Sequence, residues 1–209
     1  MTGAAVRSRL VELRRQRGAA RRGQELLEQK REVLLRELLR RTRLRDESRD
    51  RAVAALRGAR VHLRDAETEL GQQTCAAAAL AQPAVASVER GTETLLGIAL
   101  PTLRARFAPF RPRYGPGGTA ESLDQAGKAF AEVLPVLVRL AKEELAVRNL
   151  QRGFAQTVRR LNAIEKVILP RLDHEIRQVS SALEEEERDE ALRRKRWLAA
   201  TERGSPESR

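Results

Sequence analysis

The stretch from Val6 to Leu70 contains no proline, and its apolar side chains recur mainly in steps of three, four and seven residues. This spacing places the apolar side chains along one seam of a single long helix. The predicted seam consists of Val6, Leu10, Leu13, Ala20, Leu27, Leu34 and Leu38, followed by Ala52, Ala55, Ala59 and Ala66. At 1.5 Å per residue, such a helix is about 100 Å long. The seam is imperfect because Arg17, Arg31, Arg41 and Arg45 interrupt it.

A second apolar repeat runs through the last part of the chain in alternating steps of three and four. Its members are Val147, Leu150, Phe154, Thr157, Leu161, Ile164 and Ile168, and it resumes as Leu172, Ile176, Val179 and Leu183 after an extra step of four. Such an insertion locally unwinds a left-handed supercoil. Pro170 lies inside this run and is expected to kink the helix. The sequence leaves open whether Pro135, earlier in the same helix, also produces a kink.

Two long helices with one apolar stripe each cannot both leave that stripe in water. The sequence therefore predicts an all-α fold, a long antiparallel two-helix coiled coil formed by the N- and C-terminal helices. We expect a small irregular head between them, because residues 71–118 hold five prolines and end in Tyr114-Gly115-Pro116-Gly117-Gly118. The expected segments are residues 1–70, the head at 71–118 with a short helix at Cys75–Ala81, and a helix with a basic tail at 119–209 that begins at the N-cap Thr119.

The composition argues against a globular enzyme. Only 3% of the 209 residues are aromatic and 33% are charged, which is typical of long helices and coiled coils rather than of compact cores. The formal net charge is +12, and residues 1–64 alone carry 19 − 8 = +11. Such a stripe attracts polyanions, namely nucleic acid, an anionic membrane face or an acidic protein surface, or it is an ordinary solvated helix surface.

The residue types that carry chemistry are scarce. His62 and His174 are the only histidines, and Asp173 and Glu175 point away from His174 on a helix, so we expect no metal site. There is no phosphate-binding G-x-x-x-x-G-K-[ST] sequence and no paired nucleophile and base, so neither a cofactor nor a catalytic residue is expected. Cys75 stands alone in an alanine-rich stretch and is interpreted as a small buried hydrophobe.

Three segments resemble the D subunit of the V/A-type ATPases. At residues 161–170 the sequence is Leu-Asn-Ala-Ile-Glu-Lys-Val-Ile-Leu-Pro, close to that family's V-N-A-L-E-x-V-x-I-P. Residues 23–34 resemble its G-x-x-L-L-K-x-K-R-D-x-L, and residues 97–107 resemble its G-x-x-V-P-x-L-K-x-x-F. The near-core Asn162 and the in-helix Pro170 make the match specific, since heptads alone would not produce them.

This resemblance implies a central-stalk rotor without a catalytic site of its own. The implied partners are the catalytic and non-catalytic subunits of the ATPase hexamer, the F subunit of the stalk, and the funnel-shaped subunit over the membrane ring. No nucleic acid and no membrane insertion are expected. The resemblance also implies a location in the cytoplasm, on the inner face of the membrane. In agreement with this expectation, residues 1–18 do not resemble a signal peptide, and no uncharged stretch is long enough to span a bilayer.

Two hypotheses about particular residues follow. With the chain ends together, a double basic patch is expected to meet acidic loops of the hexamer bore. Its members are Arg14, Arg15, Arg17, Arg21, Arg22, Arg193, Arg194, Lys195 and Arg196. Asn162 is expected to fix the register of the coiled coil, and Glu184–Glu187 to pair with arginines of the facing helix.

Two other classes of protein remain open at this point. A basic coiled-coil scaffold that binds nucleic acid has the same electrostatic footprint, although aromatic side chains for base stacking are missing from the basic helix. The shorter stalk protein of export ATPases shares the hairpin architecture, but a large proline-rich head is unexpected there.

Overall fold

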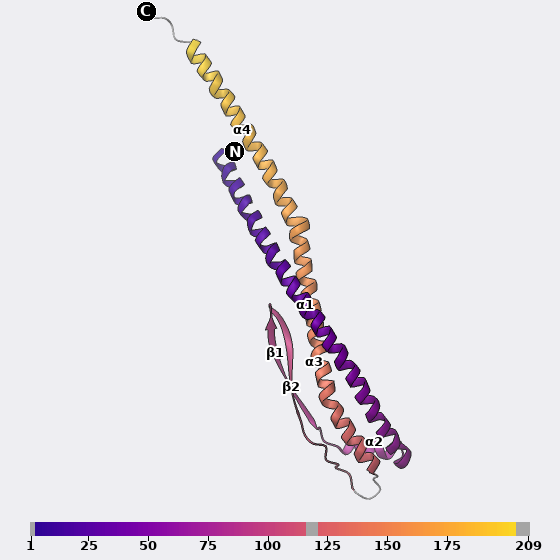
Figure 1. Cartoon of the computed structure of the whole chain (residues 1–209). Coiled ribbons are helices and arrows are strands. Elements are labelled where there is room, and N and C mark those ends of the chain that lie inside the picture. The colour runs from indigo at the N-terminus through magenta and orange to yellow at the C-terminus, as the bar shows by residue number, and fades with distance from the viewer. Residues whose placement is uncertain (1–2, 116–120, 204–209) are drawn as a thin grey trace, which may run out of the picture. The chain divides into compact units, whose positions relative to one another are not determined.

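The computed structural model describes residues 3–115 and 121–203 (Figure 1). The elements are α1 (Gly3–Leu70), α2 (Gln72–Ala81), β1 (Ala86–Leu95), β2 (Ile98–Phe107), α3 (Glu121–Ala163), the π-helix η1 (Ile164–Ile168) and α4 (Leu169–Arg203). The all-α class is confirmed, with one long N-terminal helix, long C-terminal helices and a small insert between them in the sequence. The expected N-cap Thr119 and the turn residues 116–118 lie outside the described residues.

The chain divides into two compact units. The first unit comprises Met1–Arg31 with Gln156–Arg209, and the second comprises Glu32–Ala155. The long helices contribute residues to both units, so these units differ from the three sequence segments 1–70, 71–118 and 119–209, which remain a prediction about the organisation of the chain.

In the first unit the start of α1 packs antiparallel against α4. Arg7 binds Glu187 at 3.1 Å and Arg17 binds Asp173 at 3.2 Å, so increasing numbers on one helix meet decreasing numbers on the other. The contact is closed by an apolar cluster. It consists of Leu10, Leu13 and Ile176, with Leu172, Val179 and Leu183 packed against it. This packing buries the apolar stripe of each helix, as the heptad pattern predicts.

The π-helix η1 directly precedes Pro170. The N–H of Leu169 bonds to the carbonyl of Ile164, five residues back, rather than four. Proline has no N–H, and its ring clashes with the carbonyl four residues before it in a regular α-helix, so a wider turn at this point relieves both problems. The π-helix lies where the heptad repeat takes its extra step, and it is the local irregularity that Pro170 produces. At Pro135, by contrast, α3 continues as an α-helix.

In the second unit α1 packs antiparallel against α3, and the β-hairpin covers part of the pair. Leu34, Leu100, Ala146 and Leu150 form a buried cluster, so one side chain of β2 enters the seam between the helices. A second cluster lies near the end of α1 and the start of α3 and joins α2 to both long helices. It consists of Ala66, Cys75, Ala78 and Leu123. The short helix expected at Cys75–Ala81 lies within α2.

The hairpin is a regular element that the sequence analysis treated as irregular. Strands β1 and β2 pair antiparallel from Ala86↔Phe107 to Leu95↔Ile98, and Leu96 and Gly97 form the turn. Both turn residues have positive φ, 49° and 77°, as the tight turns favoured in hairpins require. Ile98 packs where α3 has Gly153, and Asn149 donates to the carbonyl of Ala99 at 2.8 Å. The hairpin is thereby fixed to α3.

Candidate interaction surfaces

The predicted basic patch is not a single surface. In the first unit, the pairing of Arg17 with Asp173 places Arg14–Arg22 alongside the beginning of α4. The pairing of Arg7 with Glu187 means that Arg193–Arg196 come after the last α4 residues that have α1 beside them. Asp173 and Arg193 are separated by about 30 Å along a helix that rises 1.5 Å per residue. These residues therefore form two separate basic surfaces, and their contact with the hexamer bore stays a prediction.

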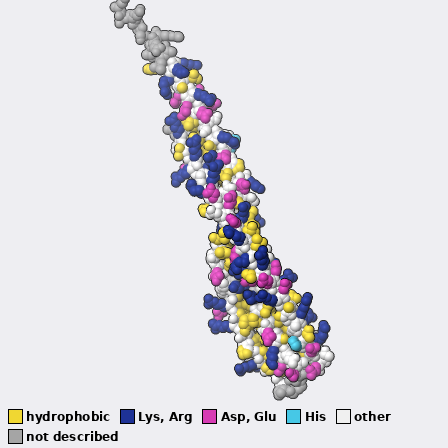
Figure 2. Space-filling view, viewed as in Figure 1, with side chains coloured by type: hydrophobic (Ala, Val, Ile, Leu, Met, Phe, Trp, Pro, Cys, Tyr) yellow, Lys and Arg dark blue, Asp and Glu magenta, His cyan; other side chains and the backbone are white. Residues whose placement is uncertain are grey.

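The basic side chains within each surface differ in their partners. Arg14, Arg15, Arg21 and Arg22 are exposed, whereas Arg17 is half-buried against Asp173. Arg193–Arg196 are all exposed, and Arg193 donates to the carbonyl of Asp189. Of the acidic run, Glu187 pairs with Arg7 on α1, and Glu184 pairs with Arg188 on its own helix. Figure 2 shows Lys and Arg side chains interspersed with Asp and Glu on the visible face.

The predicted seam residues differ in their burial. Leu34 and Leu150 are fully buried, Leu161 is buried, Leu27, Phe154 and Ile164 are half-buried, and Ile168 is exposed. Ile168 has 42% exposure and its neighbour Val167 has 61%, because the π-helix rotates the chain away from the heptad phase. The placement of Ile168 in the seam is therefore wrong. Asn162 is also exposed, since Leu161 takes the seam position beside it, so Asn162 does not fix the register.

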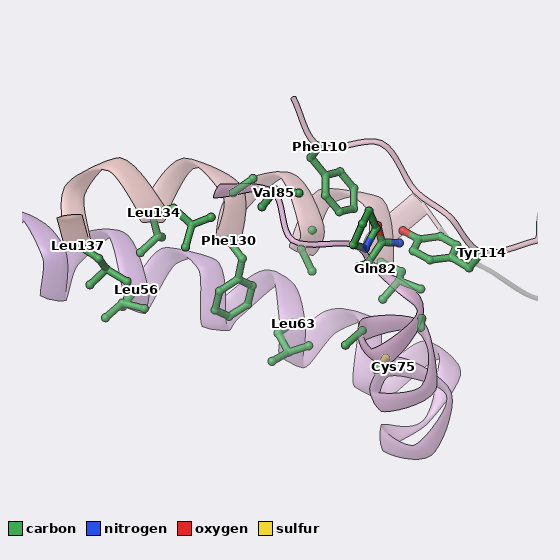
Figure 3. A pocket seen from close by; sticks show the side chains of 18 residues that line it. Leu56, Leu63, Cys75, Gln82, Val85, Phe110, Tyr114, Phe130, Leu134 and Leu137 are labelled. Carbon is green, nitrogen blue, oxygen red and sulfur yellow. The ribbon is translucent and has the colours of Figure 1, made fainter. Parts of the chain in front are cut away.

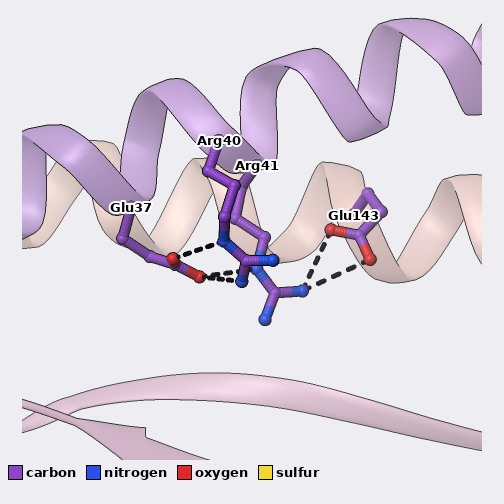
Figure 4. A network of polar contacts seen from close by, with 4 residues as sticks. All are labelled: Glu37, Arg40, Arg41 and Glu143. Atoms are coloured by element: carbon purple, nitrogen blue, oxygen red, sulfur yellow. Dashed lines mark hydrogen bonds and ion pairs between the residues drawn. The ribbon is translucent and has the colours of Figure 1, made fainter.

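A partly buried polar network lies between α1 and α3 in the second unit (Figure 4). Arg41 donates from Nη1 to both carboxylate oxygens of Glu143, at 3.0 and 3.3 Å, and from Nε to Glu37 at 2.8 Å. Arg40 donates to both carboxylate oxygens of Glu37, at 2.7 Å to Oε2 and at 2.6 Å to Oε1, the oxygen that Arg41 also bonds. The side chains of Arg41 and Glu143 are only 17% and 9% exposed. In the sequence Arg41 appears only as an interruption of the seam, and the i, i+4 spacing of Glu37 and Arg41 is the local signal for part of this network.

The network gives Glu37 an unusual acidity. The hydrogen bond from Arg40, supported by that from Arg41 and by both positive charges, lowers the pKa of Glu37 to about 2 against the opposing effect of burial. The unfolded chain therefore binds more protons than the folded chain between about pH 2 and 4.5, and this contribution to stability is lost as the pH falls through that window. Because solvent screens the exposed Arg40, it amounts to roughly 1–2 kcal/mol at neutral pH.

We therefore expect Glu37→Gln to lower the unfolding free energy at pH 7 and to flatten its fall between pH 5 and 2. Urea denaturation at a series of pH values measures both effects. Glu32→Gln, which removes one member of the exposed ion pair with Arg36, is the control. An equal loss of pH dependence in the two variants would contradict the role of the network.

An apolar cavity of about 360 Å³ lies between α1, α2 and α3 (Figure 3). Leu56, Leu63, Val85, Phe110, Phe130 and Leu134 are among the side chains that line it. Its few polar groups do not converge on a reaction centre. Tyr114 donates to Asp124, and burial followed by this hydrogen bond raises the pKa of Tyr114. Burial also raises the pKa of the Cys75 thiol, which keeps it in the neutral form of a small apolar side chain.

The described residues offer no metal site and no membrane span. Within 3–115 and 121–203, no three His, Cys, Asp or Glu side chains gather closely enough to hold a metal ion. Among the same residues, no helix is both long enough and apolar enough to cross a bilayer.

Comparison with known proteins decides the family. Residues 9–199 match the family described as the D subunit of ATP synthase. The chain belongs to this family. The matched residues include parts of the long helices of both units and the whole hairpin.

Individual relatives agree with this assignment to the D-subunit family. The V-type ATP synthase D subunit of Anaeromyxobacter dehalogenans is 35% identical over 204 residues, covering 94% of this chain and 95% of the relative. The V-type ATP synthase D subunit of Thermus thermophilus is 32% identical, with 91% and 85% covered. The A-type ATP synthase D subunit of Methanopyrus kandleri is 29% identical, with 95% and 86% covered. The chain is thus a component of a rotary, multi-subunit ATPase.

Proposed function

We propose that this chain is the central-stalk rotor of a V/A-type ATPase, which transmits torque between the catalytic hexamer and the ion-translocating ring in the membrane. The observation that carries the proposal is the membership of the D-subunit family together with antiparallel helix pairs sealed by apolar clusters in both units. Two helices packed side by side resist bending and twisting better than one, and a torque-transmitting element needs that stiffness.

The chain acts mechanically in this proposal, and other subunits bind and hydrolyse ATP. Its partners are the catalytic and non-catalytic subunits of the hexamer, the F subunit of the stalk, and the funnel-shaped subunit over the membrane ring. This assembly places the chain on the cytoplasmic, inner face of the membrane, with no insertion into the bilayer. Exposed arginines suit a sliding contact, because a single exposed ion pair contributes only about 0–1 kcal/mol and does not arrest rotation.

The two basic surfaces are separate contacts with acidic loops of the hexamer bore. Reversing Arg14, Arg15, Arg21 and Arg22 to Glu in the reconstituted complex is expected to reduce rotation-coupled ATP hydrolysis at least several-fold, because each altered contact becomes repulsive. Reversing Arg193–Arg196 to Glu tests the second surface on its own. The measurements are single-molecule rotation and ATP hydrolysis of the same preparation.

The control reverses the exposed residues Arg57 and Arg60 of the second unit, which lie outside both basic surfaces. If reversing the charges of one surface leaves rotation-coupled ATP hydrolysis unchanged, that surface does not contact the hexamer bore. Failure of the unaltered chain to assemble with other components of the ATPase would contradict the rotor function itself.

A further inference from the structure

In the second unit, the buried seam of α1 changes from apolar to polar over three consecutive core positions. Seam residues recur in steps of four and three as Leu34, Leu38, Arg41, Arg45, Ser48 and Ala52. Ser48 is 4% exposed although it is polar, and Arg41 is largely buried at the centre of the ion-pair network. Burying polar side chains between two helices costs free energy unless the side chains are hydrogen-bonded. The position of such a polar layer therefore restricts how the two helices can pair.

The alanine stretch of the seam cannot by itself define how far α1 is advanced along α3. Ala52, Ala59 and Ala66 are buried, with exposures of 2%, 2% and 0%, and they are spaced by seven residues. A shift of one heptad therefore replaces alanine by alanine along this stretch. Small, identical side chains discriminate poorly between neighbouring registers, because they offer no difference in shape or volume.

The polar layer discriminates strongly between the same registers. In the observed register Arg41 bonds to both oxygens of Glu143. A step of seven residues would instead place Arg41 opposite Val136 or Leu150, and Glu143 opposite Ser48 or Leu34. Glu143 would then be buried without its partner, and Arg41 would keep only Glu37 of its own helix. Burying an unpaired charge is far more costly than burying a matched pair.

We propose that the ion pair of Arg41 and Glu143, held from the other side by Glu37, sets the axial register of α1 against α3. Arg41 and Glu143 are positioning residues: they select one arrangement of the helices and do not need to add to overall stability. Polar groups at core positions specify register in coiled coils in this way. The inference concerns the isolated chain and does not depend on the proposed rotor function.

The test replaces the pair by apolar side chains of similar size, Arg41→Met with Glu143→Leu, in the full chain. The reporters are spin labels on cysteines introduced at the exposed positions Arg49 and Lys128, in a Cys75→Ala background that removes the native thiol. A shift of one heptad moves one helix about 10 Å along the other. Dipolar spectroscopy is expected to show one label-to-label distance in the parent and an additional population at a second distance in the variant.

Thermal unfolding separates register from stability. The apolar pair is expected to melt at or above the temperature of the parent, because apolar replacements of buried ion pairs are often neutral or stabilising. The control, Glu32→Leu with Arg36→Met, removes an exposed ion pair of the same helix and is expected to keep one distance. A single unchanged distance in the Arg41→Met, Glu143→Leu variant, or in a second apolar pair, Arg41→Leu with Glu143→Val, would overturn the proposal.

Discussion

Replacing Leu34 by alanine is expected to lower the unfolding free energy by about 3 kcal/mol, the cost of removing a large buried side chain from a packed core. Leu34 has 0% exposure and lies in the cluster with Leu100, Ala146 and Leu150, where α1, α3 and the hairpin meet. The lost side chain leaves a cavity that three separate elements would have to close together. Urea denaturation followed by circular dichroism at 222 nm measures the change.

The neighbouring residue provides a matched control. Leu35 is 42% exposed and belongs to the same helix, so Leu35→Ala removes the same atoms in the same backbone context. We expect Leu35→Ala to cost less than about 1 kcal/mol, because much of its surface is already in contact with water. Equal losses in the two variants would mean that Leu34 is not in a packed seam, and the antiparallel pairing of α1 with α3 would lose its main support.

The seam of the helices was predictable because it is a local pattern. Steps of three and four residues place Leu34 and Leu150 on the inner faces of their helices whatever the rest of the chain does. The same reasoning placed Ile168 wrongly, since it assumed one periodicity through a segment where the backbone changes to a π-helix. The extra step of four residues and Pro170 marked this place in the sequence, but the type of irregularity depends on how the helix accommodates proline.

The hairpin was not predictable from an alternation of apolar and polar residues along its strands. Along β1 every residue from Ser87 to Thr94 is exposed, so no buried face imposes a period of two on its sequence. The hairpin is held by contacts that are remote in the chain, those of Ile98 and Leu100 with the long helices. The one local signal was the turn at Leu96 and Gly97, preceded by a segment that contains Val88, Thr92 and Thr94.

The ion-pair network was also predictable only in part, because two of its members are close in the sequence and a third is remote. Arg41 was visible in the sequence as an interruption of the seam, and Glu37 as a neighbour one helical turn away. Glu143 is 102 residues further along the chain, and it becomes the partner of Arg41 only once the register of α1 and α3 is known. The predicted double basic patch divides into two surfaces for a related reason: the relative lengths of the paired helices decide which residues lie beside each other.

Replacing Gly127 by alanine is expected to destabilise the second unit by about 1–2 kcal/mol, although glycine is normally a poor residue within a helix. Gly127 lies inside α3, and a methyl group there would overlap the ring of Phe110, with Cε2 at 2.6 Å and Cε1 at 2.7 Å. Real contacts of this kind are essentially never so short, so the ring would have to leave its place in the wall of the cavity. Overpacking of this kind typically costs about 1–3 kcal/mol, which exceeds the gain in helix propensity.

The same substitution at Gly58 isolates the backbone effect. Gly58 lies inside α1, and apart from its chain neighbours and the backbone of its own helix no atom lies within 4 Å of the added methyl group. Gly58→Ala is therefore expected to stabilise the protein by about 0.5–1 kcal/mol. The two glycine variants should thus shift the urea midpoint in opposite directions. Removing the ring with Phe110→Ala should convert the effect of Gly127→Ala from a loss to a gain, because the clash and not the helix is responsible. If Gly127→Ala stabilises the protein while Phe110 is still present, the ring does not pack against this turn of α3, and the cavity wall is arranged differently.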